Sequence, residues 1–159
     1  MDKKVNYFGK EEKQNTMAMK CRGEVEGIKL NVIIDSGAAN CVMTSKLMEK
    51  LEYDIDRPSK LIAVTANGTR IQSLGEIDIE LYLEDEPVKA TVQVIESKDE
   101  TLILGNDWLQ KMKTIIDWRE KMMSIKNQGE HIDIPVEIMM EDYDSEEDES
   151  DDEEYEYEN

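Results

Sequence analysis

The chain has 159 residues, of which 39% are hydrophobic and 6% aromatic, and it carries a formal net charge of −19. This length allows one ordinary domain with a modest core and excludes two large domains. Two cysteines without a CxxC pattern and a single histidine, His131, argue against a structural zinc site.

The negative charge is concentrated at the C-terminus. Residues 141–159 contain 13 acidic residues and no basic ones, so subtracting them from the net charge leaves −6 for the rest of the chain. We expect a polar N-terminal extension over 1–16, a folded domain over 17–138 and a disordered acidic tail over 139–159. The composition of the tail favours a solubilising segment or linker, and the alternative is a docking segment for a basic partner.

No part of the sequence indicates a membrane or secretory segment. The first 16 residues contain no apolar core of a signal peptide, and no stretch approaches the roughly 20 apolar residues that span a bilayer. We therefore expect a cytoplasmic chain with Cys21 and Cys41 reduced. We expect no membrane contact and no nucleic-acid binding by the folded domain.

Alternation of apolar and polar residues begins near residue 17 and predicts β-strands. In GEVEGIKLNVIID (23–35), two runs meet at Glu26–Gly27, and the second run alternates with period 2. This pattern predicts a half-buried hairpin. The alternation ends at Ile33–Ile34, as expected of a strand that enters the core.

The segment TSKLMEKLE (44–52) changes to a helical period. Its leucines and Met48 fall on one face, and Thr44 or Ser45 can cap the start, so we expect one short helix. The strand-like pattern then returns in residues 59–75. Asn67–Gly68 lies between two stretches of this pattern, which predicts a hairpin.

The remaining elements are also mostly strands. Residues 76–95 alternate on both sides of a turn at Asp85–Pro87, and TLILGNDWLQKM (101–112) predicts an apolar strand that ends at a glycine and enters a short helix. Residues 113–138 predict a hairpin that turns at Arg119–Lys121 and a last strand. The fold class is therefore all-β with one or two short helices.

Asp35 is the residue that this pattern leaves unexplained. It directly follows the aliphatic run of 28–34, so its carboxylate is expected to emerge from the core rather than from a loop tip. A buried acid costs several kcal/mol unless it is paired or used in catalysis. Ser36 adds a hydroxyl, and Gly37 permits close backbone approach.

At this point the chain resembles the retropepsin-like aspartic peptidases, and most closely the proteases of gypsy-type LTR retrotransposons. The matching pieces are Asp35-Ser36-Gly37-Ala38, TANGT at 65–69, ILGNDWL at 103–109 and IIDWREKMMSI at 115–125. The similarity covers roughly residues 18–127, and the ordered pair of ILGNDWL and IIDW is its most specific part.

The resemblance implies a closed β-barrel that works as a homodimer with one catalytic aspartate, Asp35, in each subunit. The chain agrees independently, because it contains a single D-S-G and is too short for a second lobe. A two-fold axis would place two copies of Asp35 face to face. The two carboxylates would share a proton, so that one activates a water and the other donates to the scissile carbonyl.

The resemblance also assigns the neighbouring residues. Ser36 would hydrogen-bond across the dimer axis, and Gly37 and Ala38 would complete the loop. A flap over an extended peptide or polyprotein substrate would consist of Thr65, Ala66, Asn67, Gly68 and Thr69. Three apolar residues would border the site, although we expect them to be core residues first: Ile33, Val64 and Ile103. No metal and no cofactor is implied.

The chain departs from the family pattern at Asn106–Asp107, where retroviral enzymes carry an arginine that makes interface ion pairs. Asp107 cannot make that contact, so dimerisation is expected to use other surfaces. Trp108 is expected to pack a helix, and Asp117 is expected to be structural.

Three hypotheses follow. The leading one is a homodimeric aspartic endopeptidase from a retroelement polyprotein or a domesticated relative. The alternative is a non-catalytic dimeric module of the same fold whose acidic tail binds basic partners. A third is an acidic binding protein for histones or other basic partners, in which the β-domain is only a carrier.

Overall fold

The structure is a computed structural model that describes residues 14–64 and 67–143. Residues 19–138 form one compact unit, and the chain on either side of them forms a second. Of the second unit the structure describes only the outer ends of two strands. The expected extension over 1–16 and tail over 139–159 therefore lie largely outside the described residues.

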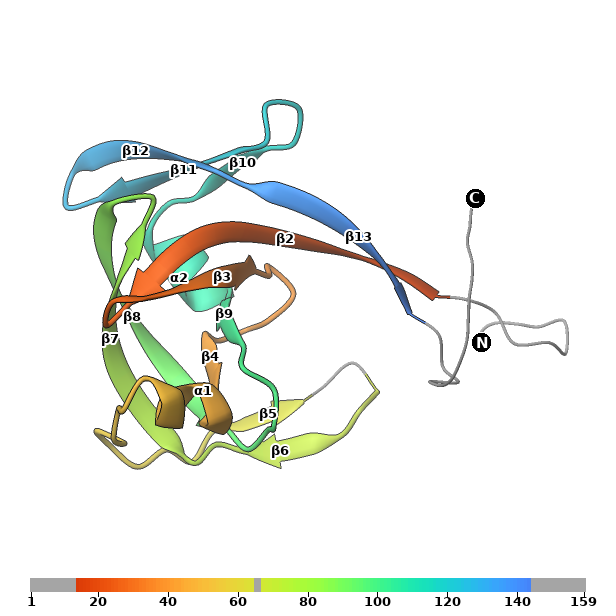
Figure 1. The fold of residues 1–159 in the computed structure, drawn as a ribbon, viewed down its shortest axis with the longest axis vertical. Helices are drawn as coiled ribbons and strands as arrows, with labels where there is room; N and C mark the ends of the chain where they lie inside the picture. The colour runs from red at the N-terminus through yellow and green to blue at the C-terminus, as the bar shows by residue number, and fades with distance from the viewer. Residues whose placement is uncertain (1–13, 65–66, 144–159) are drawn as a thin grey trace, which may run out of the picture. The chain divides into compact units, whose positions relative to one another are not determined.

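Strands dominate the described chain, with two short helices between them (Figure 1). In chain order the elements are β2 (Gln14–Val25), β3 (Ile28–Ile34), β4 (Val42–Thr44), α1 (Ser45–Lys50), β5 (Ile62–Val64), β6 (Arg70–Gln72), β7 (Gly75–Leu83), β8 (Glu86–Ile95), β9 (Leu102–Leu104), α2 (Asn106–Lys111), β10 (Ile115–Asp117), β11 (Met122–Asn127), β12 (Glu130–Pro135) and β13 (Glu137–Tyr143). The predicted all-β class with two short helices is confirmed.

Six strands close into a barrel in the order β2-β3-β9-β4-β8-β7, because β2 also pairs with β7. The closure is short, with Gly23 opposite Leu83 and Glu24 opposite Tyr82. Closing the sheet removes the free edges that an open sheet of this size would expose. Strands β5 and β6 form a separate two-stranded hairpin, and β10, β11 and β12 form a three-stranded sheet (Figure 1).

Two-residue turns fix the register of the long hairpins. Glu26 and Gly27 both have positive φ (51° and 79°) between β2 and β3, and Glu84 and Asp85 (48° and 77°) do the same between β7 and β8. Two successive positive φ values are those of a type I′ turn, whose twist matches that of the strands. The first turn confirms the prediction, and the second lies one residue before the predicted Asp85–Pro87.

Alternation along the strands builds the core. In β7 every second residue is buried, from Ile77 to Leu83, and β8 supplies Val92 opposite Ile77 and Val88 opposite Leu81. The fully buried side chains of the barrel also include Val32, Met43, Leu102 and Leu104. Burial of these aliphatic side chains is the main source of stability, at roughly 1.5–3 kcal/mol each.

The first helix forms where the sequence predicts it, but its hydroxyls act elsewhere. Thr44 occupies the N-cap position without a side-chain cap bond. Its Oγ1 instead accepts a hydrogen bond from the Thr101 backbone N–H at 3.0 Å, and Ser45 Oγ accepts one from the Ser97 N–H at 3.1 Å. The expectation of a side-chain cap is therefore wrong, because both hydroxyls hold the loop before β9.

The C-terminal third contains more strands than the sequence predicts. The turn after β10 spans residues 118–121 as expected, but β11 continues into a second hairpin at Gln128–Gly129, followed by β12 and β13. Strand β13 reaches Tyr143 and so includes the first residues of the segment expected to be a disordered tail. Within the described chain, neither helix has the length and hydropathy of a membrane-spanning segment.

Candidate active site

The loop that carries Asp35 begins where β3 ends and is held mainly by backbone groups. The Asp35 N–H donates to the Leu104 carbonyl at 3.1 Å, which continues the parallel pairing of β3 with β9. The Asp35 carbonyl accepts from the Ala38 N–H at 3.1 Å, and its carboxylate Oδ1 accepts from the Gly37 N–H at 2.8 Å. The carboxylate is thus fixed by its own loop as well as by its strand.

The same loop crosses closely over Gly105, at the junction of β9 and α2. A Cβ added at Gly105 would lie 2.4 Å from the Asn40 carbonyl oxygen and 2.8 Å from that of Ala38, closer than any real side chain comes. Two backbone N–H groups of α2 complete the crossing: Asn106 donates to Ala38 at 2.7 Å and Asp107 to Ala39 at 3.1 Å. The glycine is therefore required by space and not by its φ angle.

Asp107 joins this loop to the start of α2. Its carboxylate accepts from the Asn40 side-chain amide at 3.4 Å and from the Cys41 thiol at 3.3 Å. Burial raises the pKa of the Cys41 thiol to about 12, and the nearby negative charge of Asp107 adds to the effect. The residue that departs from the family pattern thus supports the loop from within the same chain.

The described chain exposes the loop to solvent. Asp35, Ser36 and Gly37 are all exposed, so Asp35 is not a buried acid in the single chain. The physical reason is that β3 ends at Ile34, and the next residue already projects beyond the barrel. Solvent and the Gly37 N–H therefore satisfy the carboxylate without the penalty of burial.

The expected apolar neighbours do not belong to the core. Ile33 and Ile103 face each other on parallel strands and are half-buried, whereas the residues on either side of them are buried. Their side chains therefore point away from the barrel interior. Ile33 lies two residues before Asp35, so the two residues are on the same face of the chain. Val64 is 61% exposed, so its assignment to the core is also wrong.

The hairpin of β5 and β6 carries the expected flap. Ile62 pairs with Gln72 and Val64 with Arg70, and the tip contains Gly68 with a φ of 88°. The Thr69 N–H donates to the Asn67 side-chain oxygen at 3.1 Å, which stabilises the turn. Two residues of the expected flap, Thr65 and Ala66, lie outside the described residues.

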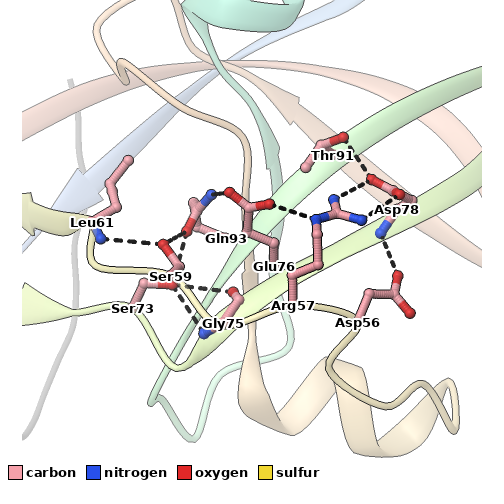
Figure 2. A network of polar contacts seen from close by, with 10 residues as sticks. All are labelled: Asp56, Arg57, Ser59, Leu61, Ser73, Gly75, Glu76, Asp78, Thr91 and Gln93. Atoms are coloured by element: carbon pink, nitrogen blue, oxygen red, sulfur yellow. Dashed lines mark hydrogen bonds and ion pairs between the residues drawn. The ribbon is translucent and has the colours of Figure 1, made fainter.

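A polar network that the sequence did not reveal holds the base of this hairpin (Figure 2). Its centre is the Gln93 side chain on β8, which is buried. The Gln93 oxygen accepts from the hydroxyls of Ser59 at 2.7 Å and Ser73 at 2.9 Å, one from each end of the hairpin. The Gln93 nitrogen donates to a carboxylate oxygen of Glu76 at 3.0 Å.

Arg57 closes the network on its exposed side. Its guanidinium binds Glu76 at 3.0 Å and both oxygens of Asp78, at 2.8 and 2.9 Å. These bonds, together with one from Thr91, lower the pKa of Asp78 to about 2. The amide of Gln93 and then Arg57 lower the pKa of Glu76. The Asp56 carboxylate accepts from the Asp78 N–H at 2.8 Å.

The two other predicted structural residues behave as expected. Trp108 is buried and its indole N–H donates to the Lys89 carbonyl at 3.0 Å. Asp117 accepts from the N–H groups of Arg119 and Glu120, both at 3.0 Å, and so caps the turn after β10. Among the described residues, no group of three or more potential ligands is placed to hold a metal ion.

The chemistry of the site is therefore that of one exposed carboxylate that follows an apolar strand face. Two surface cavities, of about 470 and 590 Å³, lie elsewhere, and no residue of the loop 35–40 lines either of them. A single carboxylate can accept a proton from water, but an acid–base pair at this site needs a second acid.

Comparison with known proteins agrees with this geometry. The family model described as the PEG10/RTL1 protease domain matches residues 31–132, which contain Asp35, the hairpin and the β9–α2 junction. The retroviral protease-like domain of Ddi1 from Leishmania major is 22% identical, with a TM-score of 0.58 over 75% of this chain and 93% of that one.

Two further solved structures are similar. The EIAV protease in complex with the inhibitor HBY-793 is 19% identical, with a TM-score of 0.50 over 71% of this chain and 99% of that one. A retropepsin-like aspartic protease from Rickettsia conorii is also 19% identical, with a TM-score of 0.48 over 65% of this chain and 93% of that one. The likeness to Ddi1 and to the EIAV protease shows the retropepsin-like fold.

Proposed function

This chain belongs to the PEG10/RTL1 protease domain family, and from that premise we propose that it is an aspartic-type endopeptidase that cleaves a peptide or polyprotein. The observation that carries the proposal is the position of Asp35. Its carboxylate lies at the end of β3, fixed by the Gly37 N–H and by the parallel strand β9, and is exposed beside an apolar strand face.

The active unit in this proposal is a homodimer. The chain has one D-S-G motif, so the second carboxylate comes from Asp35 of a second copy. The exposure of Asp35 and Ser36 in the single chain is consistent with a surface that a second copy covers. Two adjacent carboxylates cannot both ionise easily. The pair therefore titrates in two steps, and it holds one shared proton at any pH between the two pKa values of the pair.

The proposed reaction needs no covalent intermediate. The ionised Asp35 takes a proton from a water between the two copies, and that water attacks the scissile carbonyl. The protonated Asp35 donates to the carbonyl oxygen, which gives a neutral gem-diol. Ser36 would hydrogen-bond across the dimer axis.

The substrate in this proposal is an extended strand. It would lie between the hairpin of β5 and β6 and the loop 35–38, with backbone hydrogen bonds to the hairpin. The flap residues 65–69 would close over it and exclude water. The exposed or half-buried side chains of Ile33, Val64 and Ile103 would contact apolar substrate residues.

The test is cleavage of a mixed peptide library by the full chain and by Asp35→Asn, between pH 4.5 and 7 and over a protein dilution series. We expect Asp35→Asn to cleave at least about 100-fold more slowly than the wild type. Activity per chain is expected to fall on dilution, because each active site needs two copies. The matched control is Asp117→Asn, which removes an exposed acid from the turn after β10.

Three results would contradict the proposal. Equal cleavage by wild type and Asp35→Asn would show that another group, or a contaminant, does the chemistry. Activity that is independent of dilution down to the monomer would contradict the shared site. A dimer without cleavage at high protein concentration would favour the non-catalytic module, and binding assays with residues 141–159 deleted would then test the acidic tail.

A further inference from the structure

We propose that Gln93 is a positioning residue that couples the hairpin of β5 and β6 to the loop carrying Asp35, and so sets where the flap lies over the substrate. The role in substrate cleavage rests on the proposed function, but the coupling itself does not. It follows from what the backbone and the side chain of Gln93 contact.

The side chain of Gln93 binds both ends of the hairpin. Ser59 lies three residues before β5, and Ser73 directly follows β6. Each hydroxyl also accepts a backbone N–H of its own segment, from Leu61 at 3.1 Å and from Gly75 at 3.1 Å. One amide oxygen therefore holds the chain entering the hairpin and the chain leaving it, and both of its lone pairs are used.

The backbone of Gln93 binds the end of the Asp35 loop. Its N–H donates to the Cys41 carbonyl at 2.9 Å, in the parallel pairing of β4 with β8. The Cys41 thiol in turn accepts from the Gly105 N–H at 3.4 Å, at the crossing that supports the loop. Gln93 thus lies between the hairpin base and the Asp35 loop and is bonded to both.

The orientation of the amide is set by its neighbours. Its nitrogen faces the Glu76 carboxylate, which can only accept when ionised, and its oxygen faces two hydroxyls. Arg57 holds Glu76 in place through the opposite carboxylate oxygen. A flipped amide would place two acceptors together, so the network permits only one arrangement.

Buried, fully bonded amides are sensitive to loss of one partner. Gln93 and Ser73 are only 6% and 5% exposed. A side chain without hydrogen bonds at position 93 would remove the acceptor that joins Ser59 to Ser73, and the Ser73 hydroxyl would keep only the carbonyl oxygen of Gly75 at 3.1 Å, in its own segment, and the longer contact to Val94. The hairpin has only two short strands, which cannot hold a fixed position by themselves. Its position therefore depends on the bonds at its base.

The test is amide hydrogen exchange of the full chain, read by mass spectrometry, for wild type, Gln93→Met and Thr91→Val. Methionine keeps the length of the side chain and removes all three hydrogen bonds. Thr91 is the matched control, because it lies on the same strand and in the same network but bonds Asp78 instead of the hairpin base. We expect about tenfold faster exchange in β5 and β6 for Gln93→Met and no change there for Thr91→Val.

Two further variants keep the proposal testable if Gln93→Met does not fold. Ser59→Ala removes one half-buried hydroxyl and is expected to speed exchange in the hairpin even if Gln93→Met does not fold. The pair Glu76→Gln with Gln93→Glu swaps donor and acceptor and is expected to restore part of the protection that Gln93→Glu alone loses. Unchanged hairpin exchange in Gln93→Met or Ser59→Ala, or an equal increase across the whole barrel, would overturn the proposal.

Kinetics separate this inference from the proposed function. If the wild type cleaves peptides, Gln93→Met is expected to raise KM by about tenfold and to change kcat by less than about threefold, because a displaced flap weakens substrate binding rather than proton transfer. A loss in kcat alone would contradict a positioning role. If the wild type cleaves nothing, the proposed function fails while the exchange experiment still decides the coupling.

Discussion

The loop that carries Asp35 and the base of the hairpin are held in different ways. Backbone groups hold the loop, through bonds to Leu104, Asn106 and Asp107 and a close crossing over Gly105. At the hairpin base, buried side chains add to the backbone bonds from Ser73 to Leu61 and from Leu74 to Val94, because the amide of Gln93 binds two serine hydroxyls.

This difference teaches where each region is sensitive to substitution. A loop held by main-chain bonds tolerates many side chains but not a Cβ at its crossing point. A hairpin held by buried side-chain bonds tolerates changes along its strands but not the loss of a single amide. The contrast can be tested by substitutions that act on only one of the two regions.

The largest expected effect is that of Gly105→Ala. The new Cβ would meet two carbonyl oxygens at 2.4 and 2.8 Å, and because these belong to the backbone they cannot rotate away. We expect a loss of about 3 kcal/mol in the free energy of unfolding, measured by urea denaturation. The substitution would displace the loop 35–40 and would leave the hydrogen bonds of Gln93 in place.

Gly129→Ala is the matched control for this prediction. Gly129 has a φ of 83°, and a Cβ added there meets no atom within 4 Å, so only backbone strain opposes alanine. We expect a loss of about 1 kcal/mol at this turn. If the two variants lost the same free energy of unfolding, the chain around Gly105 would be able to relax around the new Cβ, and the close crossing would not be what requires the glycine.

A smaller effect is expected for Asp107→Ala. The substitution removes the acceptor for the Asn40 amide and the Cys41 thiol and a favourable negative charge in the first turn of α2. We expect a loss of about 1 kcal/mol in the free energy of unfolding, because both contacts to the loop are long and the shorter bond from the Trp108 N–H, at 2.7 Å, is local to the start of α2. Cys41 is 1% exposed, so its alkylation by iodoacetamide is expected to quicken as the loop opens more often.

Asp107→Asn sharpens this prediction because it keeps one acceptor oxygen and removes the charge. We expect Asp107→Asn to lower the free energy of unfolding by less than Asp107→Ala does. The alkylation rate of Cys41 is expected to stay nearer to that of the wild type. Equal alkylation rates in all three proteins would show that Asp107 does not hold the loop. The backbone bonds to Ala38 and Ala39 would then be sufficient.

The difference between the two regions also explains what the sequence could predict. The hairpin at Glu26–Gly27, the strand before Asp35 and the glycine between β9 and α2 are all local patterns, and each was confirmed. The ends of strands and the turns between them follow from such patterns because neighbouring residues determine them. The fold class and the place in the sequence where the Asp35 loop begins could therefore be predicted.

The network at the hairpin base could not be predicted in the same way. Ser59 and Gln93 are 34 residues apart, and Ser73 and Gln93 are 20 apart, so no local pattern joins them. Serine and glutamine are also common on protein surfaces, where most of them have no special role. The exposure of Asp35 was missed for a related reason, since a run of aliphatic residues does not show at which residue the strand leaves the barrel.

The smallest expected effect concerns the exposed ion pair of the network. Asp78 has its pKa lowered to about 2, mainly by hydrogen bonds from Arg57 and Thr91, whereas the carboxylate in the unfolded chain keeps its ordinary value near 4. The ionised form is thus favoured in the folded chain. The stability that it contributes is present above about pH 4 and is lost as the pH falls from 4 towards 2.

The substitution Asp78→Asn therefore measures how much the exposed ion pair with Arg57 contributes to stability, for comparison with the buried amide of Gln93. Because the Asp78 and Arg57 side chains are 58% and 46% exposed, solvent screening limits the effect to less than about 1 kcal/mol at pH 6. Urea denaturation of wild type and variant at pH 6, 4 and 2 is expected to show a difference that becomes smaller between pH 4 and pH 2. A difference as large at pH 2 as at pH 6 would mean that hydrogen bonding or packing at position 78, and not its charge, supports the network.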